Sequence, residues 1–490
     1  MILLKQKNII SLISLIVLLL LLYPLTIKAA GNTFYVAPAD PEITTEGDGS
    51  YDNPWRNLQD VITNKVETRR SKNSPYDGEL IIKNEGAPIK AGDTIILKDG
   101  FYGKLKITHS FNEDYITIKS ENNHLAVFSH LYVMSSSHWI LNNLAVNREI
   151  DIPEDEQNDD TNKLIKLEGA WHGPSQYITI EECEISTIMN SSAWSKEDWD
   201  QKAVDGIFSS GKLITINNNH LFNINYGIQI QGGSNSTVSN NLLDGICADG
   251  LQGIGDDLIF ENNIVKNFYQ VDGNHLDGFQ SWIKPPSDPN GNSSDRITIR
   301  GNIFIEHEDS DHPFRSRSLQ GICIFDGPCH DWVIENNVVI VGSHWGIALE
   351  GGQNSKIINN TILAVPGSGG AAQIRVFKTT YGGIMPDNVI VRNNITKLLN
   401  HEGNVIVDHN LIISEDQYDD VFVNAIDDSN YDLHLKPGSL AINTGSSSSA
   451  PDIDIEGNSR PYGNGYDIGA YEYQGELDPP PAAPTNLEVE

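Results

Sequence analysis

The chain has 490 residues, a formal net charge of −33 at pH 7 and only four cysteines. So acidic a surface keeps a protein soluble and excludes binding to nucleic acid and to anionic membranes. The cysteines are too few for a disulfide framework and show no CxxC spacing, so we interpret them as small core residues, with a local bridge between Cys323 and Cys329 as an alternative.

The amino-terminal segment has the pattern of a signal peptide. Lys5 and Lys7 precede an apolar run over residues 9–22, and Ala29 and Ala30 follow. This run is too short and too early in the chain for a stable membrane span. We therefore expect residues 1–30 to be removed, no membrane insertion afterwards, and a protein that is secreted or held at the cell surface.

The next segment predicts the start of a solenoid. Residues 34–38 form an apolar strand, residues 47–50 a glycine-containing turn, and residues 53–62 an amphipathic helix. Their order resembles the strand, turn and helix that plug the amino end of secreted right-handed β-helix proteins. Residues 92–102 resemble the first full rung of the polysaccharide-lyase-like members of that class. A solenoid needs such a cap, because an open first rung would expose its core and a strand edge.

A short phrase then recurs, in which a β-branched or apolar alternation ends in paired asparagines or in Gly-Asn. Its last asparagine returns after 22, 22, 39, 35, 23 and 34 residues, at positions Asn219, Asn241, Asn263, Asn302, Asn337, Asn360 and Asn394. A unit of 22 to 23 residues repeated with insertions is typical of a solenoid, and its strands are too short for helices. The paired asparagines suit the corners, where they tolerate a left-handed bend and can form a ladder from rung to rung. The predicted fold is therefore an all-β, single-stranded right-handed parallel β-helix with an amino-terminal capping helix, over residues 31–475.

The carboxyl-terminal part predicts a closing segment and a tail. Residues 454–461 and 467–473 resemble the segment that closes β-helix proteins of this class. Residues 476–490 begin with a proline-rich stretch that predicts a stiff linker. They end in a phrase that resembles the first strand of a truncated fibronectin type III module.

Function is expected where one face of several rungs carries polar side chains in register. When the rungs are aligned on their glycines, the residues that precede the glycine form one row, and the residues two positions after it form a second row. Neighbouring rungs lie about 4.8 Å apart. The predicted outer face then carries the acids Asp205, Asp249 and Asp277, the amides Gln229, Gln252 and Gln280, and the aromatic neighbours Tyr226, Trp282 and Trp345. Amides bind sugar hydroxyls and aromatic rings stack on sugar faces, so this surface predicts a carbohydrate site. Each Asp-Gly pair also fits a plain turn before a strand.

The longest insertions fall beside the same rungs. Residues 281–296 and 306–317 carry Lys284, Arg315 and Arg317, which are cations in a very acidic chain. Long loops on one side of a rigid solenoid are where binding sites are usually built, and these cations would suit a uronate carboxylate. The alternative is that the arginines pair with acids of their own loop.

A resemblance to known enzymes narrows the chemistry. Residues 272–282 and 319–324 resemble secreted β-helix proteins related to polysaccharide lyases and uronate epimerases. More distantly, residues 275–277, 343–346 and 375–378 resemble parts of polygalacturonases. Where that family has its paired acids, this chain has Leu319 and Gln320. Glycoside hydrolysis needs two carboxyl groups at a defined separation, so we do not expect hydrolysis by that mechanism.

β-Elimination needs a base for the proton at C5 of a uronate, and a cation or Ca²⁺ to neutralise the adjacent carboxylate. The catalytic candidates are His275, Lys284, Arg315 and Arg317, and the substrate-binding candidates also include Arg375 and Lys378. Ca²⁺ held by Asp205, Asp249 and Asp277 is the cofactor that the sequence allows.

We therefore expect a monomeric, exported β-helix that binds acidic polysaccharide and cleaves a uronate polymer by β-elimination. The alternative is a non-catalytic carbohydrate-binding or cell-surface adhesion solenoid, for which the same groove would suffice.

Overall fold

The computed structural model describes residues 31–40, 42, 45–148, 162–283, 294–308 and 311–475. The predicted signal peptide, the tail over residues 476–490 and Lys284 lie outside the described residues. No helix in the described ranges is long and apolar enough to cross a membrane.

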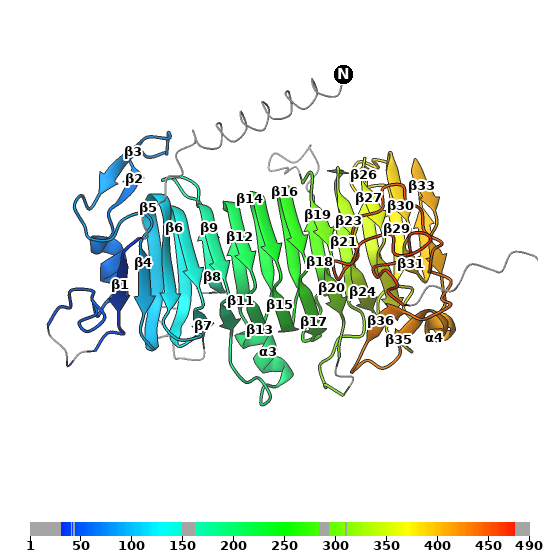
Figure 1. The fold of residues 1–490 in the computed structure, drawn as a ribbon, viewed down its shortest axis with the longest axis horizontal. Helices are drawn as coiled ribbons and strands as arrows, with labels where there is room; N and C mark the ends of the chain where they lie inside the picture. The colour runs from blue at the N-terminus through cyan, green and yellow to red at the C-terminus, as the bar shows by residue number, and fades with distance from the viewer. Residues whose placement is uncertain are drawn as a thin grey trace, which may run out of the picture.

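The chain coils into a parallel β-helix whose strands stack side by side along its long axis (Figure 1). Three parallel sheets form its sides, and we number them from the side that carries the polar row. Sheet 1 contains β8 (Lys163–Glu168), β11 (Asp205–Ser209), β18 (Asp277–Trp282), β21 (Gln320–Phe325), β25 (Trp345–Glu350), β29 (Gln373–Phe377) and β32 (Leu398–His401). Sheet 2 contains β1 (Thr33–Val36), β4 (Thr94–Leu97), β9 (Gln176–Glu181), β12 (Lys212–Asn217), β19 (Thr298–Arg300), β23 (Val333–Glu335), β27 (Lys356–Ile358), β30 (Val389–Arg392) and β33 (Val405–Asp408).

Sheet 3 completes each coil. It contains β7 (Ala145–Asn147), β10 (Glu184–Ser186), β13 (His220–Ile224), β15 (Leu242–Ile246), β17 (Ile264–Phe268), β20 (Ile303–Ile305), β24 (Val338–Val341), β28 (Thr361–Ala364), β31 (Ile395–Thr396) and β34 (Leu411–Ile412). Long strands bend from one sheet into the next: β5 (Gly100–Ser120), β6 (Ala126–Asn142), β14 (Ile228–Ser239) and β16 (Leu251–Glu261). The predicted parallel β-helix is thus confirmed.

The core lies inside the coil, because alternate residues of every strand point inward. In sheet 1 the inward row runs through Ile207, Ile228, Leu251, Phe279 and Ile322, each directly paired with the next and fully buried. The row continues to Ile347 in β25. This is the register that alignment of the glycines predicted.

Ile347→Ala should lower the free energy of unfolding by about 2 to 5 kcal/mol, because it leaves a cavity in a packed interior. Gln280→Ala, an outward and part-exposed position of the same sheet, should change it by less than about 1 kcal/mol. Denaturant unfolding of both variants measures the difference. Equal losses would mean that the inward and outward positions have been exchanged.

The paired asparagines form the corner between sheets 2 and 3. The first member of each pair is left-handed, with φ of 56° at Asn218, Asn240 and Asn262. The second member donates its side-chain N–H to the side-chain oxygen of its counterpart in the next rung at 2.9 to 3.1 Å, in an unbroken series from Asn219 to Asn410. The predicted structural role of these asparagines is confirmed.

The amino end carries the predicted cap. Helix α2 (Leu58–Asp60) starts after Asn57, whose side chain accepts a hydrogen bond from the Asp60 backbone, and continues into a π-helical turn, η1 (Val61–Lys65). Leu58, Val61 and Ile62 are buried against the first rungs. An antiparallel hairpin of β2 (Thr68–Ser71) and β3 (Leu80–Lys83) follows the cap.

The carboxyl-terminal segment lies along the solenoid. It contains η3 (Glu415–Gln417), α4 (Tyr418–Val421), β35 (Phe422–Asn424) and β36 (Asp432–Leu435), which lie beside the last rungs of sheet 3 (Figure 1). Arg460 forms a fully buried ion pair with Glu472 at 2.8 Å and donates to the side chain of Asn336 at 3.3 Å. Residues 454–473 therefore pack against the asparagine corner.

Two minor elements complete the chain. Helix α3 (Lys196–Lys202) lies in an insertion before β11, and β22 (Cys329–His330) pairs with β26 (Gly352–Gln353). All four cysteines are buried and free. The alternative of a local bridge between Cys323 and Cys329 is therefore wrong, because the thiols of these residues, in β21 and β22, are both free.

Candidate active site

The outer face of sheet 1 carries the predicted polar row. Gln229, Gln252 and Gln280 are direct strand partners in β14, β16 and β18. The glycine before each inward residue makes room for a core side chain of sheet 3: a Cβ at Gly250 would lie 2.4 Å from the Val265 side chain. The residue before the glycine, Asp249 in this rung, lies just ahead of the strand.

A groove of about 560 Å³ follows this face. Seven of the predicted residues line it: Tyr226, Gln252, His275, Gln280, Trp282, Trp345 and Arg375. Sequence reasoning missed Phe325, Asp326, Glu350, Phe377 and Thr380. The predicted register could have identified two of these residues. Phe325 is the strand partner of Trp282, and Phe377 lies two residues after Arg375, on the same face of the sheet.

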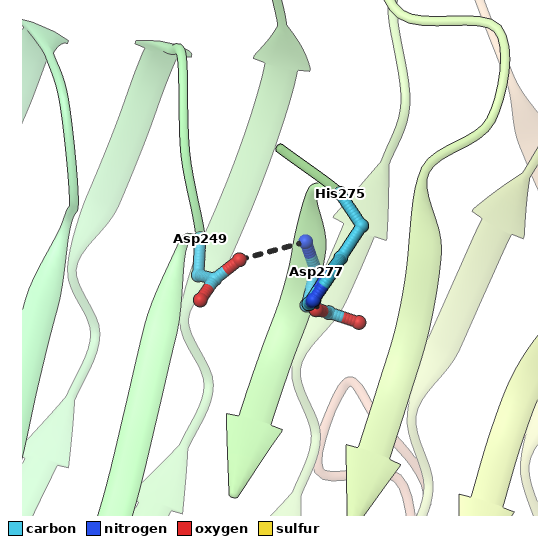
Figure 2. Close-up of side chains that lie close together, drawn as sticks. All are labelled: Asp249, His275 and Asp277. Carbon is cyan, nitrogen blue, oxygen red and sulfur yellow. Dashed lines mark hydrogen bonds and ion pairs between the residues drawn. The ribbon is translucent and has the colours of Figure 1, made fainter. Parts of the chain in front are cut away.

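His275, Asp277 and Asp249 form a compact cluster at the start of β18 (Figure 2). His275 Nδ1 lies 2.8 Å from Asp277 Oδ2, and the Asp277 backbone N–H donates to Asp249 Oδ1 at 3.1 Å. Asp277 is fully buried and Asp249 is 2% exposed, whereas the side chain of His275 is 53% exposed. The imidazole is therefore the member of the cluster that a ligand in the groove can reach.

Burial sets the protonation of the cluster. Desolvation, together with the nearby Asp277 carboxylate, raises the pKa of Asp249 to about 7. Burial also raises the pKa of Asp277, although its hydrogen bond with His275 opposes this. The same hydrogen bond raises the pKa of His275 above its ordinary value.

The free energy of unfolding should fall as the pH rises through the range in which this cluster loses its protons. A group with a raised folded-state pKa stabilises the fold below its unfolded pKa and loses that contribution as the pH rises through the folded pKa. For Asp249 this window runs from about 4 to about 7, and the shift corresponds to a few kcal/mol at most. Asp277 and His275 act in the same direction. Melting curves of wild type and Asp249→Asn between pH 4 and 8 should show a flatter dependence for the variant, and parallel curves would contradict the assignment.

Gln252 is less accessible than its outward position suggested. It is 2% exposed, its amide N–H donates to Asp249 Oδ2 at 2.7 Å, and its oxygen accepts from Gln229 and Gln231 at 2.8 Å each. These hydrogen bonds hold the Gln252 amide against Asp249 and so position that carboxyl group. The side chain of Gln280, by contrast, forms no hydrogen bond with a described residue. Gln280 is therefore the amide of the row that remains open to a ligand.

The far end of the groove is cationic and aromatic. The Arg375 guanidinium lies 4.4 Å from the ring centroid of Phe377 and 5.1 Å from that of Trp345. It forms no ion pair with an acid of the described ranges. Lys378 is exposed just beyond Phe377 and does not line the groove.

The three predicted metal ligands do not converge. Asp205 accepts hydrogen bonds from Lys163 and Asn225, both at 3.0 Å, and His275 takes its place in the cluster with Asp249 and Asp277. Ca²⁺ takes six to eight oxygen ligands. Two carboxylates already bonded within the protein and one imidazole nitrogen do not fit that preference, so we derive no step through calcium.

Millimolar Ca²⁺ should accordingly leave the melting temperature within about 1 °C of its value in chelator, since only a ligand bound by the folded state stabilises it. Differential scanning calorimetry in both buffers provides the measurement. A rise of several degrees that disappears in Asp277→Asn would restore a metal role for this cluster.

The predicted catalytic arginines lie elsewhere. Arg315 and Arg317 line a second cavity that shares no lining residue with the groove. The loop before β21 places them beside β20 and the carboxyl-terminal segment. The structure therefore separates them from the cavity that His275 lines.

Comparisons with known proteins agree with this architecture. A family described as a right-handed β-helix region matches residues 161–281. A search of curated proteins found no match. Similar solved structures include the complex of XylC with xylose (TM-score 0.52, 9% identity, covering 90% of this chain and 99% of that one) and pectate lyase Pel9A (0.41, 14%, 91% and 97%). Another is the A-module of mannuronan C-5 epimerase AlgE6 from Azotobacter vinelandii (0.42, 14%, 66% and 91%). At such identities the likeness concerns the fold alone, and the family match and the XylC structure support the predicted right-handed β-helix.

Proposed function

We propose that the protein cleaves a uronate-containing polysaccharide by β-elimination in the groove on sheet 1. The observation that carries this proposal is the half-exposed His275 imidazole held by the buried Asp277 carboxylate. A histidine oriented by a buried acid is a common arrangement for a general base.

His275 serves as the base. With Asp277 ionised, Nδ1 carries the ring proton and donates a hydrogen bond to Oδ2, so Nε2 keeps a free lone pair. Nε2 removes the proton from C5 of the uronate, the electron pair forms the C4–C5 double bond, and the bond from C4 to the bridging oxygen breaks. Asp277 also stabilises the imidazolium that results.

Gln280 and Tyr226 supply the remaining parts. The open amide of Gln280 donates to the uronate carboxylate, where negative charge accumulates after C5 loses its proton. Tyr226 lines the same groove, and desolvation, aided by Asp249, raises the pKa of its hydroxyl. Tyr226 therefore remains protonated at working pH and can give its proton to the leaving oxygen.

The rest of the groove binds neighbouring sugar units. Trp282, Phe325, Trp345 and Phe377 offer ring faces for sugars. Arg375 lies three strand pairings from Gln280, or roughly 14 Å at the usual strand spacing. Arg375 would therefore bind the carboxylate of a further uronate unit rather than of the one that reacts.

Hydrolysis by the two acids fits this geometry less well. Asp249 and Asp277 lie in neighbouring rungs, but both are buried and hydrogen-bonded within the protein. A glycosidase needs both carboxyl groups in contact with the substrate or its attacking water. The two acids instead position and tune His275.

A panel of uronate polymers tests the proposal. Elimination creates an unsaturated sugar that absorbs in the ultraviolet, whereas hydrolysis and simple binding do not. We expect absorbance to rise with at least one polymer that carries uronates and not with neutral polymers. Binding to a uronate polymer without any unsaturated product would overturn the lyase proposal in favour of a carbohydrate-binding solenoid.

A further inference from the structure

A second cavity, of about 420 Å³, lies where the ends of β20 and β28 meet the loop between β35 and β36. Its wall includes Glu306, Arg315, Arg317, Val365, Ile426 and Asp428. This size is within the range of small-ligand sites. None of these residues lines the groove on sheet 1.

One side of the cavity is cationic. Arg315 Nη1 donates to the His312 carbonyl at 3.2 Å, and neither Arg315 nor Arg317 pairs with an acid that the structure describes. Glu308, one of the acids expected to neutralise them, pairs with Lys266 at 2.6 Å instead. Two guanidinium groups that form no ion pair with a described acid, in a chain of net charge −33, form a site suited to a planar anion such as a carboxylate.

The wall also holds an unused hydrogen-bond acceptor. Glu306 is fully buried, and its Oε1 accepts from the Leu319 backbone at 2.9 Å, but its Oε2 accepts no hydrogen bond from the protein as described. Gly342 makes room for this oxygen, since a Cβ there would lie 2.5 Å from it. A buried acceptor without a donor is rare in a native structure.

The remaining wall supports the same ligand. Asp428, the second acid of the wall, has its Oδ2 3.7 Å from His307 Nδ1. Val365, Pro366 and Ile426 provide an apolar surface beside the polar groups. A carboxylate, hydroxyls and an apolar ring face are the features that a sugar acid combines.

We propose that this cavity binds a sugar acid, with its carboxylate on Arg315 and Arg317 and its ring against the apolar wall. The unit could be a free monosaccharide acid or the end of an acidic oligosaccharide, because both present the same groups. The proposal is independent of the elimination chemistry, since it uses no residue of the groove.

Equilibrium binding of D-glucuronate to full-length protein tests it. Arg375→Ala serves as the background, so that the cation of the groove does not contribute. Isothermal calorimetry should detect glucuronate and not D-glucose, and adding Arg317→Gln should weaken binding at least about tenfold, the scale of one lost charge-assisted hydrogen bond. Arg300→Gln is the matched control: Arg300 is 48% exposed, pairs with Glu261 and lies on sheet 2. Its variant should bind as the background does.

The outcomes of these binding experiments distinguish a free monosaccharide acid from the end of an acidic oligosaccharide. Binding of both glucuronate and a uronate trisaccharide, each weakened by Arg317→Gln, supports a site for sugar acids in general. Binding of the trisaccharide alone, again sensitive to Arg317→Gln, assigns the cavity to chain ends. Equal affinity in the Arg317→Gln and Arg300→Gln proteins, with melting temperatures unchanged, or equal binding of D-glucose, would overturn the proposal without bearing on turnover in the groove.

Discussion

His275→Ala should lower turnover of the cleaved polymer at least about a hundredfold while the fold stays intact, which is the scale of a lost general base. The imidazole is the only exposed member of the cluster of Asp249, His275 and Asp277, and its orientation depends on a single hydrogen bond of 2.8 Å. Initial rates from product absorbance, with circular dichroism as the check on folding, measure the effect.

A second histidine of the chain is a matched control. His330 Nδ1 lies 2.9 Å from Asp295, and its side chain is 46% exposed, but it belongs to β22 and does not line the groove. His330→Ala should therefore keep wild-type turnover. Equal rates in the His275→Ala and His330→Ala proteins would move the base elsewhere on the solenoid.

Asp277→Asn should show whether Asp277 positions and tunes His275 or only stabilises the fold. The hydrogen bond that His275 donates to Asp277 raises the pKa of His275, and a base must be neutral to act. In wild type the acid limb of the pH–rate profile should therefore have an apparent pKa above the ordinary pKa of histidine. In the variant it should move to lower pH as turnover falls. A fall in turnover with an unmoved acid limb would contradict the role of Asp277 as the residue that positions and tunes His275.

Asn337→Ala should lower the free energy of unfolding by about 4 to 6 kcal/mol, because it breaks four hydrogen bonds at a fully buried position. The Asn337 amide donates to Ile299 and Asn360, and its oxygen accepts from the backbone and the side chain of Asn302. Denaturant unfolding measures the loss.

Asn240→Gly is the control for this effect. Asn240 is the exposed, left-handed member of its pair, with φ of 56°, and its side chain makes one hydrogen bond, to Asn217. Glycine adopts this conformation without strain, so the variant should stay within about 1 kcal/mol of wild type. A comparable loss in both variants would mean that the buried ladder contributes no more to stability than the exposed corner position.

The repeated phrase was enough to predict the solenoid, its asparagine corners and the register of sheet 1. The reason is that each rung packs only on its neighbours, so a repeated phrase of 22 to 23 residues specifies strand, corner and inward face locally. Gln229, Gln252 and Gln280 were placed in one row by this register alone, and the structure confirms the row.

The environment of each outward residue depends on contacts that the repeat does not specify. The sequence placed His275 near Asp277 but gave no sign that the acid would be fully buried and bonded to the imidazole, or that Gln252 would be enclosed by its neighbours. Arg315 was predicted beside His275, yet the insertion that carries it folds toward sheet 3, where the carboxyl-terminal segment completes a separate cavity. Insertions lie outside the repeat, so their positions depend on contacts between segments far apart in the chain, and a local period cannot specify such contacts.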